Sequence, residues 1–142
     1  MADAADPKGY VIPGMTYRDA PAAIDWLCDV LGFERRLVVP GENGTIAHAQ
    51  LTHGNGMIML GSAKVDDPGA IVFPAEPGGR LTQANLVVVS GIEAHYERVK
   101  AAGAHIVMEL QEQFYGGSLF AVRDPEGHLW HVGSYDPWAE PQ

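Results

Sequence analysis

The chain has 142 residues, of which 46% are hydrophobic and 19% are charged, which suits one folded domain or two small fused modules. Its 18 Asp and Glu outnumber its nine Lys and Arg, and the net charge of −9 argues against nucleic acid as a partner. No apolar run approaches the roughly 18 residues of a membrane span. Residues 1–8 are acidic and lack an apolar core, so we expect a flexible tail, no signal peptide and a cytoplasmic protein.

The first half of the chain predicts a strand, a helix and three further strands. The first strand is expected over 10–18, and the helix over 20–31, with Asp19 as its N-cap and Gly32 at its end. The three later strands are expected over 33–39, 45–51 and 57–61. Residues 64–81 contain three Pro and three Gly, which is the composition of a linker.

The second half repeats this order. Residues 19–24 align with 91–96, and residues 60–62 align with 132–134, both at an offset of 72. The repeat predicts modules over 9–63 and 82–136, joined by the linker 64–81 and followed by a C-terminal tail over 137–142. Each module alone would leave one sheet face bare. The expected fold class is therefore α+β, with paired βαβββ modules forming a curved mixed sheet around a cleft and the helices outside.

The stretch from Phe120 to His131 predicts a β-hairpin that turns at 124–127. A four-residue turn would place Val122 opposite Leu129 and Phe120 opposite His131, and residues opposite one another share a face. Strand alternation then predicts one concave, mostly apolar surface, which is typical of a small-molecule site. Its expected ligand-binding residues, with Val88 beside them and His131 as the main polar anchor, are Thr16, His48, Gln50, Met57, Met59, Leu86, Phe120, Val122, Leu129 and His131.

Two of these assignments have simpler alternatives. Thioether side chains adapt to flat ligands and to ordinary packing equally well, so Met57 and Met59 fit either a ligand pocket or the core. His48 could equally be a hydrogen-bonded histidine at the rim of the sheet.

The βαβββ repeat, Val30-Leu-Gly-Phe33 and Arg123-Asp-Pro-Glu-Gly-His-Leu-Trp130 resemble the vicinal oxygen chelate superfamily of glyoxalases, bleomycin resistance proteins and extradiol dioxygenases. The resemblance covers about residues 10–135 and implies the paired-module fold and a homodimer. In the superfamily's metalloenzymes, the first and last strand of each module hold one divalent ion. The matching positions here are Ile12, Met59, Ala84 and His131. Three of these side chains are unsuited to a hard divalent cation.

Three functional hypotheses remain open. The first is a binding protein without a cofactor that sequesters a small, partly aromatic molecule. The second is a lyase, isomerase or dioxygenase that uses one Zn, Mn, Ni or Fe ion held by His48 and His131. Gln50 would assist, or Gln83 or Asn85 if the strand register shifts by one residue. The third is a metal-independent enzyme in which His131 is the acid or base.

The apolar segment 135–138 indicates a surface that a partner covers. Trp138 follows the last expected strand, where a large apolar side chain would otherwise face water. We therefore expect a homodimer in which Trp138 is at least partly buried.

Overall fold

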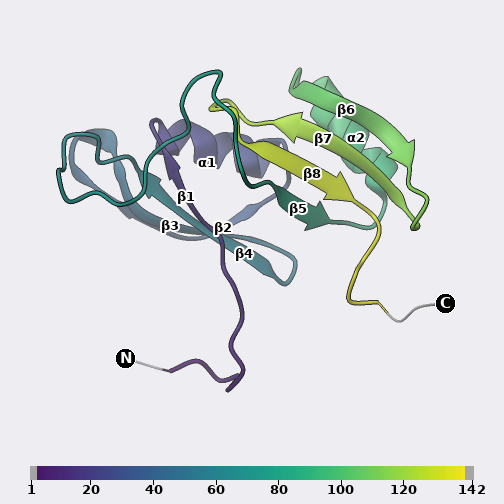
Figure 1. Ribbon diagram of the computed structural model, residues 1–142, viewed down its shortest axis with the longest axis horizontal. Helices are drawn as coiled ribbons and strands as arrows, with labels where there is room; N and C mark the ends of the chain where they lie inside the picture. Colours follow the sequence, from purple (N-terminus) through teal and green to yellow (C-terminus); the bar gives the residue numbers. More distant parts are fainter. Residues whose placement is uncertain (1–2, 140–142) are drawn as a thin grey trace.

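The computed structural model describes residues 3–139, and the ends of the two predicted tails, residues 1–2 and 140–142, lie outside the described part. It contains two βαβββ modules in the predicted order (Figure 1). The first module is built from β1 (Gly14–Tyr17), α1 (Ala20–Asp29), β2 (Glu34–Pro40), β3 (Ile46–His53) and β4 (Gly56–Ser62). The second is built from β5 (Asn85–Val88), α2 (Ile92–Ala101), β6 (His105–Glu112), β7 (Ser118–Arg123) and β8 (Leu129–Gly133).

Each module forms its own four-stranded mixed sheet. The strand orders are β1-β4-β3-β2 and β5-β8-β7-β6, and in each sheet the first strand runs parallel to the last. Gly14 pairs with Met59 and Leu86 pairs with His131, so both members of the pair are displaced by 72 residues between modules. The α+β class and the repeat are therefore confirmed, with two separate sheets in place of one continuous sheet.

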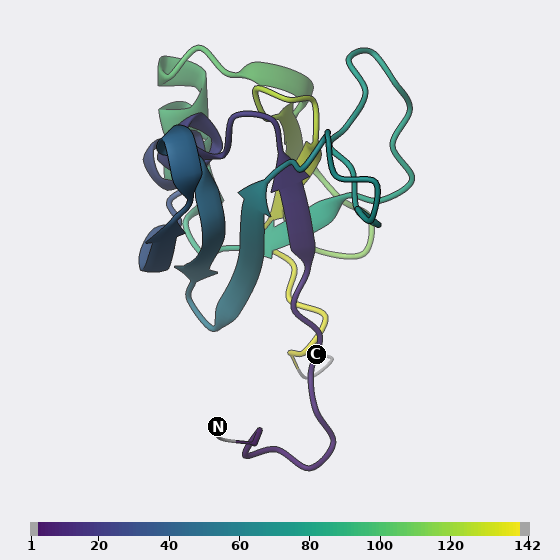
Figure 2. The same cartoon turned by 90° about the vertical axis from the view of Figure 1, so that its left-hand side faces the viewer.

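Both helices lie on the same side of the two sheets, and the linker passes on the opposite side (Figure 2). The Asp19 carboxylate accepts a hydrogen bond from the backbone N–H of Ala22 at 3.1 Å, which caps α1 as predicted. The space between the helices and the sheets holds one core with side chains from both modules. Its largest fully buried members are Trp130, Tyr17, Phe120, Leu27, Leu51, Val99 and Val122.

The loop between β7 and β8 joins the second module to the first. Tyr17 donates a 2.6 Å hydrogen bond to the Asp124 carboxylate, which also accepts one from the Trp130 indole N–H at 3.2 Å. The Glu126 carboxylate accepts hydrogen bonds from the backbone N–H groups of Arg18 and Asp19 at 2.7 and 2.8 Å. Because a helix N-terminus favours negative charge, Glu126 of one module stabilises the start of α1 in the other.

Burial protects this contact from water. Asp124 is 5% exposed, and its carboxylate has a donor on each oxygen. Burial first, and the Asp124 charge second, raise the pKa of Tyr17 far above its usual range. The Tyr17 hydroxyl therefore stays protonated and remains a donor at any physiological pH.

A second contact between the modules lies at the other end of α1. Arg98 of α2 donates from Nε to the carbonyl oxygen of Val30 at 3.2 Å, which satisfies a backbone group at the helix end. Phe33 packs edge-on against Trp130 with ring centroids 5.6 Å apart. The two contacts fix both ends of α1 against the second module. No helix in residues 3–139 is both long and apolar enough to cross a membrane.

Candidate functional site

The open face of the first sheet, the face away from α1, carries five of the predicted site residues. Gln50 pairs with Met59, and Met57 pairs with Thr52 across β3 and β4. Thr16 pairs with Gly61, and His48 lies two residues from Gln50 on the same face. The intervening Ala49 and Leu51 are fully buried in the core. The predicted facing of Thr16, His48, Gln50, Met57 and Met59 is therefore correct, and ligand binding by them stays a prediction.

His48 and Gln50 contact each other on this face. The amide Nε2 of Gln50 lies 3.2 Å from His48 Nε2. With the amide in this orientation, Gln50 donates the hydrogen bond and His48 Nε2 accepts it.

A cavity of about 440 Å³ lies against this face. Its lining on the sheet side includes Met15, Thr16, His48 and Met59. Lys64, Asp67 and residues 69–72 of the linker line it as well. All of the lining residues belong to the first module or the linker. The cavity is therefore a mostly apolar space with a few polar groups, which is the usual character of a small-molecule site.

Phe120 and Val122 do not reach the open face, so their predicted position is wrong. The turn between β7 and β8 has five residues, 124–128, closed by a 2.9 Å hydrogen bond from Asp124 N to His128 O. Val122 therefore pairs with Trp130, and Phe120 pairs with Val132. Phe120 and Val122 are both 0% exposed.

Phe120 and Val122 face the core because the second module is one residue shorter before β7 and one residue longer in the turn after it. Gln50 and Ala121 hold equivalent places opposite Met59 and His131, and they differ by 71 residues, whereas Met59 and His131 differ by 72. The second module loses one residue before β7 and regains it in the turn. A one-residue shift reverses every side chain of a strand, so β7 turns Phe120 and Val122 into the core and Ala121 towards the open face, where it is still only 2% exposed.

The remaining predicted residues lie on the open face of the second sheet. Leu86 pairs with His131, and Leu129 pairs with Arg123. Leu86 is 47% and Val88 41% exposed. His131 is half-buried and makes no side-chain hydrogen bond to any residue within 3–139. Both of its ring nitrogens are therefore free to contact a ligand.

The predicted single surface is divided among separate cavities. Met57, Leu86 and Val88 line a second cavity of about 790 Å³ between the modules, together with Trp130 and Trp138. Leu129 lines a third, of about 590 Å³, beside residues 78–84 of the linker. Gln50 and His131 line none of the three. None of these three cavities therefore contains both His48 and His131.

The residues at the four positions that match the metal ligands of the superfamily's metalloenzymes do not fit a divalent ion. Ile12 and Ala84 precede β1 and β5, and Met59 and His131 occupy β4 and β8, so imidazole is the only suitable donor among the four. No group of three or more His, Cys, Asp and Glu within 3–139 could hold a metal ion. Asn85, one of the two alternative ligands, donates to Met15 Sδ at 3.5 Å.

The sequence reasoning missed the linker as part of the cavity. Residues 64–81 were expected only to connect the modules, yet Ile71 and Val72 line the cavity on the first sheet. The available signal was the run Ile71-Val72-Phe73, three consecutive apolar side chains inside a Pro- and Gly-rich segment.

The geometry agrees with the comparisons to known proteins. A family model for the Glyoxalase/Bleomycin resistance protein/Dioxygenase superfamily matches residues 5–132. The chain belongs to this superfamily. An uncharacterised protein of Mycobacterium bovis is 31% identical over 125 residues, which cover 85% of this chain and 80% of the relative.

Solved structures share this fold. The crystal structure of TioX from Micromonospora sp. ML1 is similar with a TM-score of 0.70 and 36% identity, covering 88% of this chain and 97% of that chain. The fosfomycin resistance protein FosX from Listeria monocytogenes has a TM-score of 0.65 at 11% identity, covering 92% and 94%, and shows the fold alone. The superfamily's name spans resistance proteins and dioxygenases, so the function must be argued from the site.

Proposed function

We propose that the protein binds a small, largely apolar and partly aromatic molecule on the open face of the first sheet, as a sequestering protein without a metal cofactor. One observation carries the proposal. At Met59, where the superfamily's metalloenzymes place a ligand to the ion, this chain has an apolar side chain that lines the 440 Å³ cavity. A position that serves chemistry in those enzymes is here part of an apolar wall.

The contacts in the cavity fit such a ligand. Met59 offers a polarizable thioether, which packs well against an aromatic ring. His48 and Thr16 supply polar groups on the sheet side that would orient the ligand, and Ser62, Lys64 and Asp67 add others at the same cavity. Ligand recognition is then mostly apolar contact, with one or two hydrogen bonds fixing the orientation.

We also propose that His131 forms a hydrogen bond to a ligand that extends to the second sheet. Its ring nitrogens have no partner within 3–139, and Leu86 lies beside it as an apolar contact. A hydrogen bond to a neutral ligand at this ring contributes about 0.5–1.5 kcal/mol.

We infer that the functional form is a cytoplasmic homodimer. Trp138 is 95% exposed in the single chain, and Leu86 and Val88 are 47% and 41% exposed. A second copy that covers these side chains would remove apolar surface from water.

A ligand screen with a metal measurement tests the proposal. Thermal shift on the wild type and Met59→Ala should find flat aromatic hits whose stabilisation the substitution reduces, and His131→Ala should reduce it for hits that reach the second sheet. Elemental analysis of the same dialysed protein should find far less than one metal ion per chain. About one tightly held ion per chain would favour the lyase, isomerase or dioxygenase alternative.

A further inference from the structure

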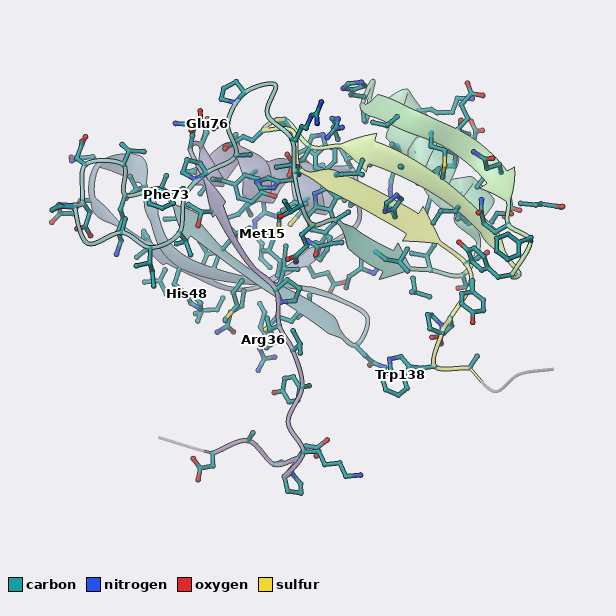
Figure 3. All side chains as sticks on the ribbon, in the orientation of Figure 1. Met15, Arg36, His48, Phe73, Glu76 and Trp138 are labelled. Carbon is teal, nitrogen blue, oxygen red and sulfur yellow. The ribbon has the colours of Figure 1, made fainter. Side chains whose placement is uncertain are left out.

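The cavity on the first sheet has an outer wall made by the linker between the modules. Ala70, Ile71 and Val72 line the cavity together with Met59. The linker runs on the side of the sheets opposite the helices, and Figure 3 shows Phe73 on this segment. Without the linker, the open face of the first sheet would have no cover on this side.

The linker is held at its two ends. At the start, Ala63 N donates to Tyr17 O at 2.8 Å, which ties the linker to β1. At the far end, Glu76 lies 3.8 Å from Arg18 in an exposed ion pair. Such a pair contributes little to stability, so this end is only weakly restrained.

Asp67 shapes the turn that precedes the apolar run. Its carboxylate accepts a hydrogen bond from Gly69 N at 2.8 Å, and its carbonyl oxygen accepts one from Ala70 N at 3.1 Å. Asp and Asn commonly form turns of this kind with their own backbone. The turn determines the direction in which residues 70–72 leave, along the cavity.

The segment after this turn is held by packing at the buried Pro74 and, within residues 3–139, not by hydrogen bonds. Residues 71–75 make no hydrogen bond to either module within the described chain. Ile71, Val72 and Phe73 are 90%, 64% and 71% exposed. Few backbone bonds and exposed apolar side chains are the properties of a segment that opens easily and gains contacts by closing.

We propose that residues 69–73 form a strap that closes over the ligand, with Ile71 and Val72 as the apolar wall that faces Met59. The ligand is then a flat molecule with two apolar faces, one against the thioether and the other against the strap. Its polar edge points towards Thr16 and His48. This inference rests on the proposed function and adds the ligand's shape and its second contact surface.

The neutral, flat dye Nile red, which fluoresces in apolar surroundings, serves as the probe. It is titrated into the full-length wild type, Ile71→Ser/Val72→Ser, Val65→Ser and Met59→Ala. Val65 is the matched control because it is 64% exposed, as Val72 is, and lies in the same linker without lining the cavity. Loss of two apolar contacts should weaken binding by about tenfold in the double variant. Val65→Ser should bind as the wild type does.

Melting temperatures distinguish weaker dye binding from a loss of the fold. The melting temperatures of the linker variants should match the wild type, because the substituted side chains are exposed. Amide hydrogen exchange of residues 71–75 should slow when the dye is bound.

The outcomes separate the two proposals. If Met59→Ala weakens binding while the double variant binds as Val65→Ser does, the strap is wrong and the proposed function stands. If the wild type binds no dye saturably, or if neither Met59→Ala nor the double variant weakens binding, both proposals are wrong.

Discussion

Replacing Tyr17 by Phe removes a single hydroxyl group from the contact between the two modules. That hydroxyl is fully buried and donates a 2.6 Å hydrogen bond to the Asp124 carboxylate. A hydrogen bond to a charged group contributes about 1.5–3 kcal/mol, and leaving a buried acceptor with fewer donors costs in the same direction. Asp124 keeps the Trp130 indole and two backbone N–H donors. We therefore expect Tyr17→Phe to lose about 1.5–2 kcal/mol of unfolding free energy at pH 7.

The difference in unfolding free energy between the wild type and Tyr17→Phe should shrink as the pH rises above about 10. The folded-state pKa of Tyr17 is raised from 10.0 by burial and by Asp124, whereas the unfolded chain has the ordinary value. The stabilising effect is therefore complete below pH 10 and is lost as the pH rises above it, by about 1.4 kcal/mol per unit. The Phe variant lacks this group, so the gap between the two proteins should close at about pH 11 to 12.

Urea unfolding at pH 7, 9, 10 and 11, followed by circular dichroism, measures both effects. Tyr10→Phe is the control because Tyr10 is 73% exposed and should leave the unfolding free energy unchanged at each pH. A Tyr17→Phe variant within about 0.5 kcal/mol of the wild type at pH 7, or a gap that is as wide at pH 11 as at pH 7, would refute the reasoning.

The remaining predictions concern the ligand, the assembly and one turn. Met59→Ala should weaken binding of an aromatic hit by about 1–2 kcal/mol in calorimetric titration, with little change in melting temperature; unchanged affinity would remove Met59 from the site. His131→Ala should cost about 0.5–1.5 kcal/mol with a hit that reaches the second sheet, and a gain in affinity would contradict this. Light scattering at micromolar concentration should give a dimer, which Trp138→Ser should weaken; a monomeric wild type would count against the assembly. Gly117→Ala should destabilise the fold by about 1–3 kcal/mol in urea unfolding, because Gly117 has φ +66° and an added Cβ would lie 2.7 Å from Tyr135 N; a neutral effect would contradict the turn.

The sequence was sufficient for the modules because local patterns determine them. The Asp19 cap predicts α1, and the alternation in β3 and β4 predicts the open face of the first sheet. These features depend on residues near one another in the chain. For that reason Thr16, His48 and Met59 were placed on the correct face and beside one cavity.

The wrong predictions concern places where a long-range contact, or the length of a turn by one residue, determines the structure. The hairpin after β7 has one residue more in its turn than expected, because Asp124 N bonds to His128 O, and this reverses the facing of Phe120 and Val122. Strand alternation also does not predict the angle between the two modules. The buried bond between Tyr17 and Asp124 helps to set that angle, and no local pattern predicts a contact across 107 positions. The path of the linker over the first sheet depends on the same tertiary arrangement.

The most direct test of the account is the melting temperature of chelator-treated protein with and without a flat aromatic ligand found by screening. The account predicts that the ligand raises the melting temperature of protein stripped of metal, and that Met59→Ala reduces this rise. If the rise appears only after Zn²⁺, Mn²⁺, Ni²⁺ or Fe²⁺ is restored at about one ion per chain, the metal-free binding site is contradicted.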